Sequence, residues 1–195
     1  MTSSGRRLTL SPIGFDIVLS LSQAPDGMRL ADLAHVMGSP VSSVQTALRV
    51  LISNELVRRD QVEPPRYRLT PDHPAREELA SLATVLPEPA HAIGVILRAN
   101  PVVTYAAVDS QGFIVAERDE APEAPRAALD RHLGLIAESR PETPGVMRAT
   151  ETELDRLMRV AVGLAGRAAK ALTIKGRPPV LARRDRGEDP GNRAG

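Results

Sequence analysis

Two short amphipathic segments, separated by a tight turn, constrain the fold of this chain more than any other feature. Residues 30–37 place apolar side chains at the i, i+3 and i+4 spacing of a helix with one buried face. Gly38 predicts the end of that helix, because glycine readily adopts the left-handed conformation common at helix C-termini. Ser39 and Pro40 predict the cap and first residue of a second helix. Helices joined this closely must cross at a steep angle.

The second predicted helix divides into an apolar and a polar face. The expected buried stripe recurs at helical spacing and comprises Val44, Ala47, Leu48 and Leu51, with Val41 and Ile52 at its margins. The other face is polar, with one arginine, and comprises Ser42, Ser43, Thr46 and Arg49, with Gln45 on its flank. A helix with such a face can enter the major groove of DNA and hydrogen-bond base edges. We therefore predict base contacts from these five residues.

A basic hairpin is predicted after the second helix. Residues 57–59 and 66–69 read as short strands, and Glu63, Pro64 and Pro65 lie between them. Both strands carry arginines, which are Arg58, Arg59, Arg66 and Arg68. Forked, permanently charged guanidinium groups suit contacts to a phosphate backbone. Charged side chains on an exposed strand also discourage aggregation, so an ordinary solvated edge is the alternative interpretation.

At these residues the chain resembles a known family. The run from LADLAHVMG through SSVQTALRVL and NELVRRD to PPRYRLTPDHP is similar to the winged-helix domains of bacterial transcriptional regulators of the MarR and ArsR style. The resemblance implies that residues 42–49 form the recognition helix and residues 58–68 the wing. A winged helix that contacts another protein is the alternative, since a fold does not fix a function.

Composition narrows the remaining function classes. The formal net charge is only +1, so any affinity for DNA must come from local clusters of basic residues. Aromatic residues make up 2% of the chain, which disfavours single-stranded nucleic-acid binders that stack bases on aromatic rings. Cysteine is absent, which excludes disulfides and thiolate metal sites. The sequence shows no membrane-spanning run and no signal-peptide core, and we expect a cytoplasmic protein.

The second half of the chain predicts a small α/β domain. Two strands with a hairpin turn at residues 109–112, a helix, a short strand and one long helix are expected in that order, and Thr150 with Glu153 forms a capping box for the last helix. The fold class is thus α+β. The expected parts are a winged helix-turn-helix domain at 8–72, linker helices at 73–100, the α/β domain at 101–175 and a disordered tail at 176–195.

The order of these domains resembles bacterial proteins in which a winged helix precedes a nucleotidyltransferase-like domain. That resemblance implies a Gly-Ser pair after the first strand and two acidic residues at i and i+2 on the next. Here the first strand ends in Asp109 and Ser110, and Glu117 with Asp119 is the acidic pair available. We expect a degenerate domain kept for dimerisation or ligand sensing, with no catalytic residue, metal or cofactor.

The sequence therefore predicts a bacterial transcription regulator that binds specific double-stranded DNA and is not an enzyme. A homodimer is expected, because paired half-sites give specificity that one winged helix cannot reach. The candidate dimer surfaces are residues 79–86 and the long C-terminal helix, and a small-molecule or protein effector could act at the C-terminal domain. The alternatives are a nucleotidyltransferase-type enzyme and an antitoxin-like protein-interaction module.

Overall fold

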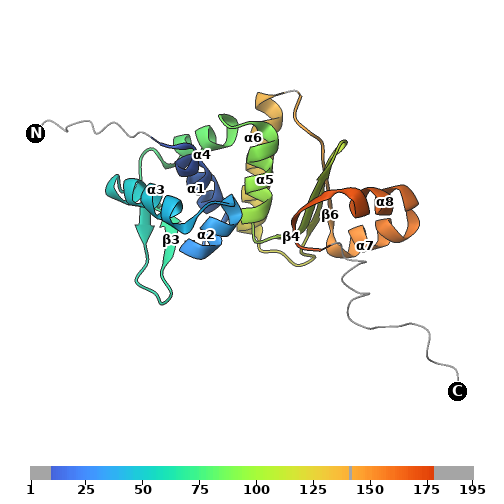
Figure 1. The fold of residues 1–195 in the computed structure, drawn as a ribbon, viewed down its shortest axis with the longest axis horizontal. Helices are drawn as coiled ribbons and strands as arrows, with labels where there is room; N and C mark the ends of the chain where they lie inside the picture. Colours follow the sequence, from blue (N-terminus) through green and yellow to red (C-terminus); the bar gives the residue numbers. More distant parts are fainter. Residues whose placement is uncertain (1–9, 141, 178–195) are drawn as a thin grey trace, which may run out of the picture. The chain divides into compact units, whose positions relative to one another are not determined.

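The computed structural model describes residues 10–140 and 142–177, which divide into two units (Figure 1). Unit 1 comprises the residues up to Pro101 together with Glu123–Thr143, and unit 2 comprises Val102–Pro122 and the residues from Pro144. This division differs from the expected one. The helices at 73–100 belong to unit 1, and residues 123–143 return to it from the α/β region.

Unit 1 begins with the predicted helix-turn-helix. Its elements are α1 (Pro12–Gln23), β1 (Met28–Arg29), α2 (Leu30–Met37), α3 (Val41–Ser53), β2 (Val57–Arg59) and β3 (Arg66–Leu69). Gly38 ends α2 in the left-handed conformation, with φ 59°, as the sequence predicts. The N-cap of α3 is Pro40, one residue later than expected, and the Ser39 hydroxyl instead donates to the carbonyl of Met37 at 3.4 Å.

The three short strands of unit 1 form an antiparallel sheet in the order β1-β3-β2. The pairing of β2 with β3 produces the predicted basic hairpin, which extends beyond the helices of unit 1 (Figure 1). Met28, Val57, Tyr67 and Leu69 are buried on its inner face. The helix-turn-helix therefore carries a wing on the sheet that follows α3.

Three further helices complete unit 1, namely α4 (Arg76–Val85), α5 (Pro89–Ala99) and α6 (Glu123–Ser139). α1 packs against α3, α4, α5 and α6. The buried Asn100 side chain donates to the Gln23 side chain at 3.0 Å and to the Pro125 carbonyl at 2.8 Å. His132 of α6 lies 3.2 Å from the Ser22 hydroxyl of α1. These polar contacts fix α6 onto α1 and onto the end of α5.

α4 leaves part of its apolar surface exposed. Leu82 and Leu86 are 43% and 56% exposed, within the stretch 79–86 that the sequence analysis gives as a candidate dimer surface. The buried residues of α4 are Ala80, Ala83 and Thr84. Small side chains let this helix approach α1 and α6 closely, which leaves the leucine stripe on the outer surface.

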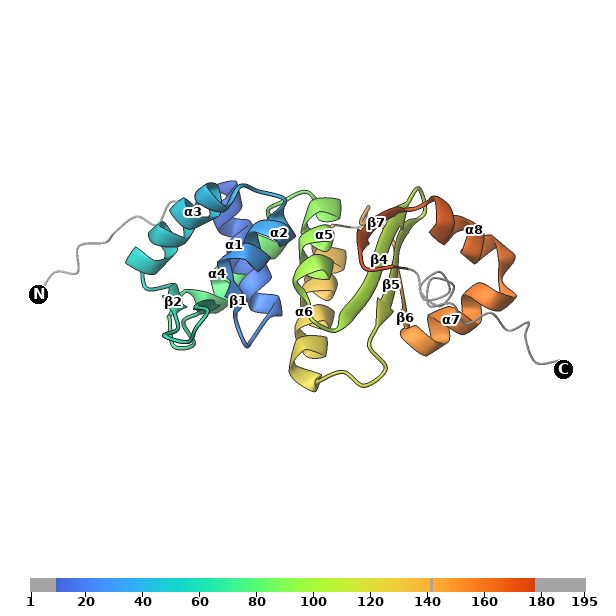
Figure 2. The same cartoon turned by 60° about the horizontal axis from the view of Figure 1, so that its bottom comes forward.

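Unit 2 is a four-stranded sheet with two helices on one face (Figure 2). Its elements are β4 (Val103–Asp109), β5 (Gly112–Glu117), β6 (Val146–Thr150), α7 (Glu151–Val160), α8 (Val162–Lys170) and β7 (Leu172–Lys175). The strand order is β6-β5-β4-β7, and β5 and β6 run parallel. Tyr105, Ile114 and Leu154 are buried in the core between the sheet and the helices.

Two features of unit 2 differ from the expectation. The single long helix is broken at Ala161, whose φ of −104° and ψ of 88° lie outside the helical region. After α8 the chain forms β7, an edge strand that the sequence analysis missed. The α+β class is confirmed, with the helix-turn-helix domain followed by the small α/β region. The predicted tail begins at Gly176, and residues 178–195 lie outside the described residues.

Candidate nucleic-acid interface

The exposed face of α3 carries four of the five residues predicted to contact bases. Burial of Val44, Leu48 and Leu51 fixes the rotation of the helix about its axis. With that face inward, the side chains left exposed to solvent are Ser42, Gln45, Thr46 and Arg49. The Thr46 hydroxyl donates to the carbonyl of Ser42 at 3.0 Å. α3 thus presents hydrogen-bonding groups of several kinds on one surface.

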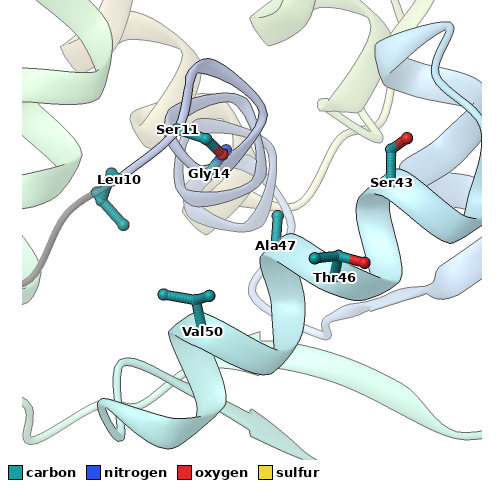
Figure 3. Close-up of a pocket in the computed structure, with 7 residues that line it drawn as sticks. All are labelled: Leu10, Ser11, Gly14, Ser43, Thr46, Ala47 and Val50. Carbon is teal, nitrogen blue, oxygen red and sulfur yellow. The ribbon is translucent and has the colours of Figure 1, made fainter.

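Ser43 is less exposed than these four. It is half-buried on the side of α3 that faces the first turn of α1, where a hollow of about 220 Å³ opens (Figure 3). Leu10, Ser11 and Gly14 line the hollow from the α1 side, and Ser43, Thr46, Ala47 and Val50 line it from α3. Its volume is below the roughly 300–1,000 Å³ of typical ligand pockets. Ser43 therefore belongs to the rim of the exposed surface rather than to its centre.

Three apolar side chains also reach the surface of α3. Val41, Val50 and Ile52 are 49%, 42% and 37% exposed. The sequence analysis placed Val41 and Ile52 at the margin of the buried stripe and assigned them no role. Apolar side chains on a recognition helix can contact the methyl group of thymine, which marks A·T pairs in the major groove. Their exposure is therefore compatible with a base-reading surface.

The register of the small sheet collects arginines on one face. Arg58 lies opposite Arg68, and Arg29 of β1 lies opposite Arg66. Because successive residues of a strand alternate between faces, all four point away from the buried inner face. A short strand at residues 28–30 that pairs with the wing was expected from the sequence, but Arg29 was not among the residues predicted to contact DNA.

The arginines of the wing differ in their partners. Arg68 binds the carboxylate of Asp60 through two atoms, with Nε 2.9 Å from Oδ1 and Nη2 2.5 Å from Oδ2. Arg66 donates to the backbone carbonyls of Gly27 at 3.0 Å and Asp26 at 3.4 Å. Arg59 is exposed at the end of β2 and forms no ion pair within residues 10–140 and 142–177. The wing therefore holds its cations close together while leaving them partly accessible.

The helices α2 and α3, the turn at Gly38 and the sheet that follows define the type of domain. Residues 13–61 match the IclR helix-turn-helix domain. The match runs from α1 to the end of β2 and stops before β3. No curated protein and no solved structure matched the chain.

The helix-turn-helix prediction is confirmed, and the type that matches is IclR. The MarR and ArsR style of the predicted resemblance is not the one this match identifies. An IclR-type domain binds DNA in transcription regulators, and it indicates a regulator rather than an enzyme. The nucleotidyltransferase-like resemblance of the second half stays a prediction.

The acidic pair of the enzyme alternative is engaged by protein groups. Glu117 is 6% exposed and forms an ion pair with Arg148 of the neighbouring strand. Asp119 accepts from the Thr152 hydroxyl at 2.8 Å and from the Thr152 amide at 3.2 Å, which caps the first turn of α7. These hydrogen bonds hold the pKa of Asp119 below its usual value. Each carboxylate thus has a structural role of its own.

Within residues 10–140 and 142–177, no three histidine, cysteine or acidic side chains gather closely enough to hold a metal ion. No helix in the same ranges is long and apolar enough to cross a membrane.

Proposed function

We propose that this protein is a transcription regulator that recognises a specific sequence in double-stranded DNA through α3. The observation that carries the proposal is an IclR-type helix-turn-helix whose third helix exposes Ser42, Gln45, Thr46 and Arg49 while its apolar face is buried. In this arrangement α3 enters the major groove, and its exposed polar groups pair with base edges.

The wing positions the protein on the backbone. Arg58, Arg59, Arg66 and Arg68 contact phosphates beside the groove that α3 occupies, and Arg29 adds a fifth cation on the same small sheet. Such contacts supply affinity without sequence information. Sequence preference then depends on α3, with Ser43 at the rim of its surface and Val41 available for a thymine methyl group.

The active species is a homodimer. Leu82 and Leu86 leave an apolar stripe on the outer face of α4, within the same unit as the recognition helix. A stripe of this kind fits a two-fold contact with the same helix of a second copy, since an isologous interface uses one patch twice. Two copies would then read two half-sites of an inverted repeat.

Selection of bound duplexes from a random pool tests the proposal directly. Purified protein is used at two salt concentrations, and the expected result is enrichment of one inverted repeat that survives the higher salt. The protein with Ser42, Gln45 and Arg49 replaced by alanine serves as the matched control, and it should bind without enrichment. Salt-sensitive binding without enrichment by the wild type would contradict sequence recognition, and a lack of binding would contradict the function as a whole.

A further inference from the structure

One carboxylate lies among the arginines of the wing. Asp60 follows β2 directly, and its amide donates to the carbonyl of Arg66 at 2.8 Å, so the backbone fixes its place in the hairpin. Its side chain is 15% exposed and is held by both donors of the Arg68 fork. The Nε of Arg58 lies 4.0 Å from the same carboxylate. Asp60 thus faces two of the cations proposed to bind phosphate.

We propose that Asp60 is an internal competitor for the DNA phosphate, which lowers the affinity of the wing for every duplex. This inference rests on the proposed function, because it concerns the same phosphate contacts. A carboxylate and a phosphate both bind the guanidinium fork through two oxygens. Arg68 therefore exchanges one bidentate partner for another when DNA arrives, and it does not offer a free fork.

The exchange is unfavourable for electrostatic reasons. When Arg68 turns to a phosphate, the Asp60 carboxylate loses its strongest partner and lies near the negative charge of DNA. The small exposed fraction of Asp60 limits how far water can replace the lost contact. Because the wing reads no bases, the same penalty applies to cognate and random DNA. When sequence-independent affinity is lower, a larger share of the binding free energy comes from the base contacts of α3. The protein is then less occupied by the large excess of non-specific genomic sites.

Asp60→Asn removes the negative charge and keeps the shape of the side chain. The control variant is Glu63→Gln, which removes the same charge from the exposed turn of the same hairpin, where Glu63 forms no ion pair with Arg58 or Arg68 in the described structure. Affinity for a cognate and a random duplex is measured by fluorescence anisotropy over a series of salt concentrations. Thermal melts confirm that each variant folds. If Asp60→Asn does not fold, Asp60→Ser is measured in its place.

We expect Asp60→Asn to bind both duplexes about two- to fivefold more tightly at low salt, the range set by a partly exposed ion pair. The plot of log affinity against log salt should steepen by up to about one unit, because the Asp60 carboxylate no longer offsets one of the positive charges that the wing brings to the phosphates. Glu63→Gln should change both quantities less. In an Arg68→Ala background, the effect of Asp60→Asn should fall to that of Glu63→Gln, since the two residues act as a pair.

The outcomes separate this inference from the proposed function. Equal effects of Asp60→Asn and Glu63→Gln on a wild-type protein that binds duplex DNA would overturn the role of Asp60 alone. Weaker binding by Asp60→Asn would also overturn it and would show that Asp60 orients Arg68 for the phosphate. Loss of duplex binding in the wild type itself would overturn the proposed function as well.

Discussion

Arg49 and Arg66 carry the same charge in different surroundings. Arg49 extends from the exposed face of α3, among polar side chains that face the same way. Arg66 is half-buried on the wing and donates to two backbone carbonyls. We propose that the first reads a base and that the second holds a phosphate, so substitution of each should cause a different loss.

Arg49→Ala should cost roughly 1–3 kcal/mol on the cognate duplex and relax the preference at one base position. Arg66→Ala should weaken cognate and random duplexes alike and reduce the salt slope by about one unit. Titrations of both duplexes with each variant measure the difference. Equal losses on the two duplexes for both variants would contradict this division of roles.

His132 links stability to pH in unit 1. Its Nδ1 lies 2.7 Å from the Ala128 carbonyl and its Nε2 lies 3.2 Å from the Ser22 hydroxyl, and the side chain is buried. Burial lowers its pKa, and the cation of Arg131 adds to this effect, while the Ala128 hydrogen bond and Glu77 oppose it. The folded state therefore favours the neutral imidazole.

A lowered pKa in the folded state fixes the sign of the pH effect. The stability contributed by neutral His132 is present above its unfolded pKa of about 6.5, and it decreases as the pH falls from there toward the folded pKa. The slope is at most about 1.4 kcal/mol per pH unit for one proton. Chemical denaturation between neutral pH and pH 5 measures it. His132→Gln should remove this part of the slope, and the same substitution at exposed His35 controls for the chemical change.

At the scale of the element, two glycines predict opposite results for one substitution. Gly112 closes the β4–β5 hairpin with φ +126°, and a Cβ there would lie 2.2 Å from the carbonyl oxygen of Gly145. Gly134 lies inside α6, where an added Cβ meets no described atom within 4 Å. Backbone geometry at the first position and helix propensity at the second determine the outcome.

Gly112→Ala should destabilise the protein by about 1–3 kcal/mol or more, because both the strained φ and the backbone contact must relax. Gly134→Ala should stabilise it by about 0.5–1 kcal/mol, the gain of alanine over glycine within a helix. Urea unfolding of the two variants beside the wild type provides the comparison. A stable Gly112→Ala protein would mean that this hairpin takes another form.

The elements also show where sequence reasoning succeeds and where it stops. α2 and α3 were predictable because local signals agree: a helical repeat, a glycine at the C-terminus and a proline at the next start. On α4 the inward-facing residues, Ala80 and Ala83, could not be named in advance, because their burial depends on how closely α4 approaches its neighbouring helices. The helical pattern of apolar residues continues across Ala161, and it therefore predicts one long helix. The structure has two helices with a break at Ala161, and tertiary packing rather than the local pattern determines that break.

The candidate site was predictable to a similar extent. The exposed positions of α3 follow from which of its residues are apolar, so Ser42, Gln45, Thr46 and Arg49 could be named in advance. The half-burial of Ser43 depends on α1, which is remote in the sequence. The pairing of Asp60 with Arg68 and of Arg29 with Arg66 depends on strand register, which composition does not reveal.

At the scale of the whole molecule, the outer face of α4 predicts the oligomeric state. Leu82→Glu combined with Leu86→Glu should convert a dimer to a monomer, because the charges would lie at the centre of the proposed contact. Light scattering gives the mass. Leu157→Glu with Val160→Glu, at exposed positions of α7, is the matched control and should leave the dimer intact. A monomeric wild type would contradict the dimer, and a monomer only in the α7 variant would move the contact to unit 2.

The chain passes between its two units three times, at Pro101, Pro122 and Thr143. During synthesis the winged helix can emerge from the ribosome early, but the buried partners of Gln23 and Ser22 arrive only with α6. The β4–β5 hairpin emerges from the ribosome before α6, and its sheet is complete only after β6 and β7 have also emerged. A DNA-binding fragment that ends at Pro101 would therefore lack α6 and part of its own core, whereas one that ends at Thr143 would keep that core and carry the β4–β5 hairpin without the rest of its sheet.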